Sequence, residues 1–195
     1  MAYVLGVIAT DGCLVEYGNG YHGFDITSKD KILLKQIKKT MQAEHKIGEK
    51  ERGSRLQVRN RKIYSDLLRL GLTPRKSRTI KFLNIPKKYL SDFVRGCFDG
   101  DGCVKVWQEP RWRHTWQIST FFCSASLPFL QTLHNQLQSK GRLLRGWIWH
   151  GPRSYYLCFA IEDSLRLFNF MYQNDSQLYL KRKKDKFESF ISLRK

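Results

Sequence analysis

Apolar and polar positions follow the same order of helical and strand periods twice along the chain. The first copy begins with an apolar helical run over 4–9, and its later segments alternate with period two or repeat every 3.6 residues. The expected elements are strands over 13–18 and 21–27, a helix over 32–41, a hairpin of 46–52 and 55–59 around Gly53-Ser54, and a helix over 63–70. This copy predicts the order α-β-β-α-β-β-α.

The second copy has the same order, displaced by close to half the chain length. Its helical run over 94–98 precedes strands over 104–109 and 113–122, a helix over 127–138, strands over 143–149 and 155–161, and a helix over 165–171. A segment rich in proline and basic residues, about 72–86, separates the copies. We therefore expect two domains: residues 1–86 with the linker, and residues 87–195 with a C-terminal helix.

Each copy opens with a helix that carries glycine in its interior and ends in Asp-Gly-Cys. Glycine inside a helix costs about 1 kcal/mol relative to alanine, so Gly6 and Gly96 need a physical reason. Close backbone packing of the two helices provides one. Helices that cross at these glycines would bring Asp11 and Asp101 together at a pseudo-two-fold interface.

Two adjacent carboxylates repel each other unless a proton or a cation lies between them. Oxygen ligands of this kind suit Mg²⁺. Two carboxylates that hold divalent metal against phosphate are a common apparatus for phosphodiester hydrolysis, because the metal activates water and stabilises the leaving oxygen. A single Asp-Gly after a helix indicates only a turn, but two copies at matching places favour a metal site.

Charge and composition narrow the class of partner. The 195 residues include 35 Lys+Arg and 17 Asp+Glu, a formal net charge of +18, and 42% are hydrophobic. This apolar content excludes a disordered basic tail. No apolar run approaches the roughly 20 residues of a membrane span, and residues 1–5 lack the basic region of a secretory signal. Nucleic acid is favoured over an anionic membrane surface, because the basic residues lie among Tyr, Trp and Gln.

Five cysteines, an odd number without a Cys-x-x-Cys pair, argue against a disulfide framework and a structural zinc site. The simplest interpretation is that they are small buried hydrophobic residues. We therefore expect an intracellular, reducing compartment, either the cytoplasm or an organelle that encodes the chain.

The two motifs, over 4–13 and 94–103, resemble the paired motifs of the LAGLIDADG homing endonucleases in their single-chain form. The second motif is a close match, whereas the first has Ala9 where many members have an acid. The resemblance covers nearly the whole chain, including segments over 71–77 and 180–183. It implies an α+β fold of two pseudo-symmetric αββαββα repeats, whose antiparallel sheets form a DNA-binding saddle around two packed motif helices.

The resemblance implies a monomeric, site-specific endonuclease that promotes intron or intein homing. Such a protein cuts both strands of a long, partly asymmetric duplex across the minor groove and leaves short 3′ overhangs. It uses Mg²⁺, with Mn²⁺ as a substitute and Ca²⁺ supporting binding without cleavage. The implied site residues are Asp11 and Asp101 as metal ligands, Lys76 and Lys183 as catalytic lysines, backbone at Ala9, Thr10, Asp99 and Gly100 as further metal ligands, and Ser28, Lys29 and Ser124 near the water network.

Structural roles compete with some of these assignments. Lys76 and Lys183 lie within basic runs, where a solvated or phosphate-contacting lysine is the commoner role. Ser28 and Ser124 also suit helix N-caps. Both readings of these four residues stay open at the level of sequence.

Alternation along the strands defines one polar face for base readout. The residues expected on this face are Val15, Tyr17, Asn19, Asp25, Thr27, Arg55, Gln57, Arg59, Lys105, Trp107, Arg113, Thr115, Gln117, Ser119, Arg145, Trp147 and Trp149. Leu14, Phe24 and Val104 alternate with them and are expected in the core. A polar sheet face that is simply wet would show the same alternation, and Trp147 and Trp149 also suit packing at a sheet edge.

Other functions fit the same pattern. A maturase with this fold would place its basic surface on structured intron RNA, and a regulator would bind DNA without cutting it. A basic protein that coats nucleic acid would fit the charge, but it gives no reason for the paired glycine helices.

Overall fold

The chain folds into the same order of elements twice, as the repeated pattern predicts. The computed structural model describes residues 1–16, 20–111, 115–173 and 178–194. The first repeat contains α1 (Ala2–Asp11), β1 (Gly12–Glu16), β2 (His22–Ser28), α2 (Lys31–Thr40), β3 (Ile47–Lys50), β4 (Gly53–Arg59) and α3 (Arg61–Arg69). The second contains α4 (Leu90–Asp101), β5 (Gly102–Gln108), β6 (Trp116–Ser124), α5 (Leu127–Gly141), β7 (Trp147–His150), β8 (Tyr155–Phe159) and α6 (Ile161–Tyr172).

Three further elements connect or extend the repeats. The short 3₁₀ helices η2 (Lys76–Arg78) and η3 (Lys87–Tyr89) lie between them, and helix α7 (Lys181–Leu193) follows the second. Helix α7 packs against strands β5 and β6 of the second repeat, and its Arg182 also pairs with Asp30 of the first repeat (2.9 Å). None of the helices in the described ranges is long and apolar enough to cross a membrane.

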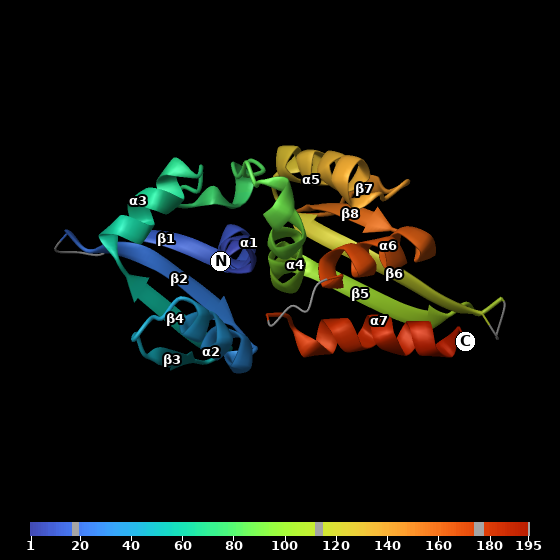
Figure 1. Ribbon diagram of the computed structural model, residues 1–195, viewed down its shortest axis with the longest axis horizontal. Helices are drawn as coiled ribbons and strands as arrows, with labels where there is room; N and C mark the ends of the chain where they lie inside the picture. Colours follow the sequence, from blue (N-terminus) through green and yellow to red (C-terminus); the bar gives the residue numbers. More distant parts are fainter. Residues whose placement is uncertain (17–19, 112–114, 174–177, 195) are drawn as a thin grey trace.

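Each repeat forms its own four-stranded antiparallel sheet. The strand orders are β1-β2-β4-β3 and β5-β6-β8-β7, so the two sheets have the same topology. The two sheets lie on either side of helices α1 and α4, which stand side by side in the middle of the molecule (Figure 1). The ends of these two helices therefore lie between the two sheets, where a ligand could contact both.

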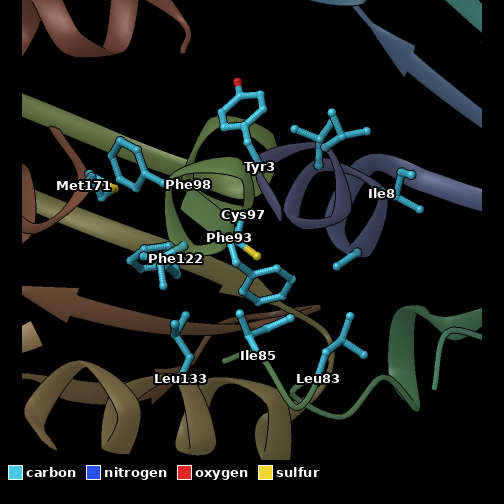
Figure 2. Packing of buried hydrophobic residues seen from close by; sticks show 14 of the residues in the cluster. Tyr3, Ile8, Leu83, Ile85, Phe93, Cys97, Phe98, Phe122, Leu133 and Met171 are labelled. Carbon is cyan, nitrogen blue, oxygen red and sulfur yellow. The ribbon is translucent and has the colours of Figure 1, made fainter. Parts of the chain in front are cut away.

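The central helices touch through their glycines, as their sequence predicts. A Cβ atom on Gly6 would lie 2.2 Å from the carbonyl oxygen of Phe93, and one on Gly96 would lie 2.1 Å from that of Tyr3. Larger side chains beside the glycines, including Phe93 and Cys97, pack around the contact (Figure 2). This contact explains the glycines, because any side chain there would separate the helices.

One continuous apolar cluster supports both sheets. Leu14, Phe24 and Val58 lie on the inner face of the first sheet, and Val104 and Phe122 on that of the second, each 3% exposed or less. The side chains that alternate with them form the outer face of each sheet. The expected core positions are therefore correct, and the alternation fixes which residues face outward.

Several boundaries in the second repeat differ from the sequence expectation, and two of them have a clear physical cause. The strand expected over 143–149 begins only at Trp147, because the backbone N–H groups of Leu144 and Arg145 donate to the Asp163 carboxylate (2.9 and 2.6 Å). The helix expected at residue 165 begins at Ile161, since acidic residues in its first turn favour a helix N-terminus. Arg145 therefore lies before a strand, not within one.

The first-repeat hairpin also turns earlier than expected. Gly53 belongs to β4 instead of the turn, which lies at residues 51–52. Its φ of +144° suits glycine, and a Cβ there would lie 2.7 Å from the carbonyl oxygen of Ser28. The glycine is thus required by a close approach to the neighbouring strand end.

Candidate functional site

Asp11 and Asp101 are the last residues of the two central helices, α1 and α4, and they lie close together where the two helices end. A Cβ on Gly100 would lie 3.4 Å from a carboxylate oxygen of Asp11, so this carboxylate reaches the last turn of the other helix. Asp11 is half-buried and Asp101 is exposed. The glycine contacts determine how close the two aspartates lie, because they fix the distance between the helices and the residues at which the helices cross.

Removal from water raises the pKa of both carboxyl groups. The pKa of Asp11 rises to about 6, first because protein surrounds the group and second because Asp101 is negatively charged. The pKa of Asp101 also rises through loss of water, although its side chain keeps contact with solvent. Lys183 and Lys76 lower the pKa of both groups. A cation between the carboxylates would relieve their repulsion.

Two buried lysines lie near the carboxylates, one from the segment between the repeats and one from the helix that follows the second repeat. Lys76 in η2 is 5% exposed and donates from Nζ to the carbonyl of Gly12. Lys183 in α7 is equally buried, and its Nζ donates to the carbonyls of Phe98 (2.6 Å), Asp99 (2.8 Å), Gly100 (3.3 Å) and Gly102 (2.6 Å). Each ammonium therefore binds backbone carbonyls at the end of a central helix, where the helix dipole is negative.

This burial corrects the alternative that the two lysines are solvated or contact phosphate. Loss of water lowers the pKa of Lys76, and it lowers that of Lys183 to about 8 against the opposing charge of Asp99. The carbonyls of Asp99 and Gly100, expected as further metal ligands, are bonded to Lys183 instead. Ala9 and Thr10 lie at the matching place in α1, where the Thr10 hydroxyl bonds within its own helix.

The Asp99 side chain points away from the carboxylate pair. It accepts hydrogen bonds from the hydroxyl of Tyr3 and from the N–H of Leu180, both at 2.8 Å. Asp99 thus ties α4 to α1 and to the residue that precedes α7. Ala9, its counterpart in the first repeat, has no carboxylate to make such a connection.

Ser28 and Ser124 occupy matching places where the second strand of each repeat ends. Their hydroxyl oxygens accept from the N–H groups of Asp30 and Ser126, both at 3.1 Å. These bonds form turns that lead into α2 and α5, so neither serine is itself the N-cap residue. Lys29, next to Ser28, is exposed.

A small cavity lies beside the carboxylate of Asp101. Its volume is about 60 Å³, and its lining includes Asp101, Thr10, Lys76, Ser77 and Ser124. The cavity is large enough for a few water molecules near Asp101. Ser124 therefore lies within reach of solvent near Asp101.

The oxygen donors at the carboxylate pair fit a hard divalent cation. Across the described residues, no group of three or more His, Cys, Asp or Glu side chains could hold a metal ion. Mg²⁺ commonly binds through one or two carboxylates and fills its other positions with water and substrate phosphate. Asp11 and Asp101 meet that requirement, and the negative ends of two helices favour a cation there.

The first sheet carries the residues expected for base readout on its outer face. These are Val15, Asp25, Thr27, Arg55, Gln57 and Arg59. Strand register places Asp25 opposite Gln57, and Thr27 opposite Arg55. Asp25 is 6% exposed and forms an ion pair with Arg55. The expected direct contact of Asp25 with a base is therefore corrected: its carboxylate instead orients the Arg55 side chain.

The second sheet brings together residues that lie far apart in sequence. Its outer face carries Lys105, Trp107, Gln117, Ser119, Trp147 and Trp149. Trp107, Gln117, Ser119, Arg145 and Trp147 line one groove of about 600 Å³. Arg145 joins this groove although it is not on a strand. Thr115 lies one residue before β6.

Other expected and unexpected positions complete this face. The expected contacts Tyr17, Asn19 and Arg113 lie outside the described residues. Phe121 and Tyr156, which the sequence reasoning missed, share the outer face with Trp149. Counting by twos from Gln117 would have found Phe121, but an aromatic residue in a strand resembles a core residue.

The two repeats, their matching sheets and the carboxylates between them define the LAGLIDADG homing endonuclease fold, and this chain has that fold. It is similar to the LAGLIDADG meganuclease I-AabMI bound to uncleaved DNA, with 14% identity, a TM-score of 0.67, and coverage of 98% of this chain and 89% of that one. It is also similar to I-SmaMI bound to uncleaved DNA in the presence of calcium ions (11%, TM-score 0.68, 98% and 89%).

A third similar structure is a mesophilic variant of the homing endonuclease I-DmoI. The identity is 17%, the TM-score is 0.62, and the alignment covers 96% of each chain. No protein-family model matches the sequence, and no curated protein matches it. The fold is thus shared over nearly the whole chain, although little of the sequence is.

Proposed function

We propose that the chain is a divalent-metal-dependent endonuclease that acts as a monomer on double-stranded DNA. The main support for this proposal is the pair of carboxylates, one from each repeat. They lie between the two sheets, at the ends of the central helices. One chain supplies both halves of the site, so no second copy is needed. The net charge of +18 supports an acidic polymer as the partner.

The residues at the site have separable tasks. Asp11 and Asp101 would hold Mg²⁺, which supplies an activated water and stabilises the leaving oxygen when bound. Lys76 and Lys183 hold the helix ends through backbone carbonyls and offset the negative charge of the two carboxylates. Arg55 and Gln57 on the first sheet have the chemistry that reads guanine and adenine edges in the major groove.

The resemblance to the LAGLIDADG homing endonucleases supports a more detailed proposal for the target and the reaction. We propose a long, partly asymmetric target, cleavage across its minor groove with short 3′ overhangs, and a role in copying an intron or intein within a reducing intracellular compartment. I-SmaMI with uncleaved DNA and calcium ions is a precedent for binding without cleavage in Ca²⁺. Mn²⁺ is expected to replace Mg²⁺, since it also prefers oxygen ligands.

Plasmid cleavage tests this function directly. A plasmid with the uninterrupted junction of the host gene should be converted to a linear product in Mg²⁺ and bound but left uncut in Ca²⁺. Asp11→Asn and Asp101→Asn should abolish cleavage and leave binding in Ca²⁺. Asp66→Asn is the matched control, because Asp66 is a partly exposed acid that lines a cavity with residues 1 and 2, at the opposite end of α1.

The outcomes separate the candidate functions. Cleavage by either Asp→Asn variant at the wild-type rate would overturn the site assignment. Binding without cleavage in both metals would instead indicate a regulator, and preference for structured intron RNA over the duplex would indicate a maturase.

A further inference from the structure

The outer faces of the two sheets differ in chemistry at matching register positions. Because the sheets share one topology, positions in the first can be matched to positions in the second through their strand registers. The matching pairs are Asp25 and Phe121, Gln57 and Cys158, Thr27 and Cys123, Arg55 and Tyr156, and Gly48 and Trp149. Apart from Gly48, the first sheet is polar at these places, whereas the second is aromatic or apolar.

The aromatic residues of the second sheet form an ordered surface. The rings of Trp149 and Tyr156 stack with centroids 4.4 Å apart and planes 14° apart. The indole N–H of Trp149 donates to the Cys158 sulfur at 3.0 Å, so its polar atom is already bonded. Trp147 lies opposite Cys158 on the edge strand and is 52% exposed. We call Phe121, Trp147, Trp149 and Tyr156 the aromatic cluster.

The surroundings of the aromatic cluster indicate nucleic acid as its occupant. It continues the outer face on which Lys105 and Gln117 lie, and the Lys105 ammonium is 5.5 Å from the centre of the Phe121 ring. Trp147 also lines the groove shared by Gln117 and Arg145. The aromatic cluster is thus an exposed apolar surface next to the cationic side chains of Lys105 and Arg145. Such a surface suits DNA, whose phosphates are negatively charged and whose bases carry apolar groups.

One apolar group is exposed on base edges in the major groove, the 5-methyl group of thymine. The Trp149 indole donor is already bonded to Cys158, so this ring presents apolar atoms to a base edge. Stacking on unpaired bases is less suited, since one face of the Trp149 ring is covered by Tyr156. The aromatic edges that remain suit van der Waals contact with methyl groups.

We infer that the aromatic cluster reads thymine 5-methyl groups in one half of the target, near the central carboxylates, while the first sheet reads the other half by hydrogen bonds. This inference rests on the proposed DNA-binding function. It predicts a target in which only one half is selected for thymine. The position near the centre follows from the register, which places Phe121 opposite Cys103, two residues after Asp101.

The test begins with selection of bound duplexes from a randomised library by the full chain in Ca²⁺. Selection with Gln57→Ala identifies the half read by the first sheet, because that half loses its base preference. The other half should contain thymines near the centre. In the selected duplex, 2′-deoxyuridine then replaces thymine in either half, which removes the methyl group and keeps the base pair.

Replacement in the second half should weaken binding by about three-fold for each methyl group in contact. Replacement in the first half should have no effect. Trp147→Ala should remove the penalty in the second half, and this exposed edge position is a mild place for substitution. Tyr89→Ala is the matched control, because Tyr89 is also exposed (45%) but belongs to η3, before the start of α4, and it should retain the full penalty.

Each failure has its own meaning. A second half without thymine, equal penalties in both halves, or a penalty that persists in Trp147→Ala would overturn the inference while DNA binding stands. Preference for single strands would indicate stacking on bases and overturn it as well. Loss of all duplex binding by the wild-type chain would overturn both the inference and the proposed function.

Discussion

Asp11 and Asp101 lie where ionisation is unfavourable without a cation. Protein surrounds much of Asp11, and Asp101 adds negative charge beside it, so the pKa of Asp11 reaches about 6. Lys183 and Lys76 only partly offset this, because the loss of water and the charge of Asp101 raise the pKa of Asp11 by more than the two lysines lower it. The residues most suited to metal binding are thus a source of instability in its absence.

This conflict predicts a pH-dependent gain in stability for Asp11→Asn. The raised pKa means that between about pH 4 and 6 the folded chain holds a proton that the unfolded chain has released. The free energy of unfolding therefore falls as the pH rises through this window. In EDTA at pH 8, Asp11→Asn should be more stable than wild type by about 1–3 kcal/mol.

Urea denaturation of both chains from pH 4 to 8 measures this difference. The gain should be absent at pH 4 and complete above pH 6, and Mg²⁺ should stabilise wild type more than Asp11→Asn. An Asp11→Asn chain that is no more stable than wild type at pH 8 would contradict the assigned cause.

Helices α1 and α4 determine the geometry of the site at the next scale. Neither helix carries the site alone, because each contributes one aspartate. The backbones touch at Gly6 and Gly96, which leaves no space for a Cβ on either side. Helix α7 then secures the end of α4 through Lys183, and η2 secures the end of α1 through Lys76.

Substitution of the contact glycine should reveal this packing. Alanine raises intrinsic helix propensity by about 1 kcal/mol, so an isolated helix would be stabilised by Gly6→Ala. In this chain the new Cβ would lie 2.2 Å from a backbone oxygen of α4. We expect a net loss of about 3 kcal/mol or more in the free energy of unfolding.

Gly48→Ala is the matched control for Gly6→Ala. Gly48 is exposed on β3, and a Cβ there has no atom of the described chain within 4 Å. Its free energy of unfolding should change by less than about 1 kcal/mol. Equal stability of Gly6→Ala and wild type in urea denaturation would show that the helices are not in backbone contact.

The whole molecule combines a two-repeat fold with an uncompensated charge of +18. Charge of this size opposes compaction of the free chain and favours a polyanionic partner. The outer faces of the two sheets supply a surface for such a partner on both sides of the carboxylates. Binding is therefore expected to depend on counterion release from DNA phosphates.

Affinity for the target duplex should fall steeply with salt. Six or more neutralised phosphates would lower the association constant by about 10³-fold or more between 50 and 200 mM salt. Fluorescence anisotropy in Ca²⁺ across this range measures the slope, with a pH-matched buffer series as the control. A flat response would argue against phosphate contacts as the source of affinity.

The sequence by itself determined the repeated order of elements, the core faces of the strands and the meeting of the two glycine helices. The element order and the core faces depend on periodicity within single segments. The meeting of the two helices follows from the same short motif in both repeats. Asp11 and Asp101 could be found for that reason. The outer-face positions of Arg55, Gln57 and Lys105 followed from period-two alternation alone.

Only the tertiary structure decided the features that join distant segments. Lys183 lies in a basic run that suggests solvent exposure, yet it bonds to carbonyls more than 80 residues away. Asp25 is buried by Arg55, and Asp163 delays the start of β7, through contacts that no local pattern records. The aromatic cluster likewise depends on how β6, β7 and β8 align. Register and helix packing create these contacts, and both are set by the fold as a whole.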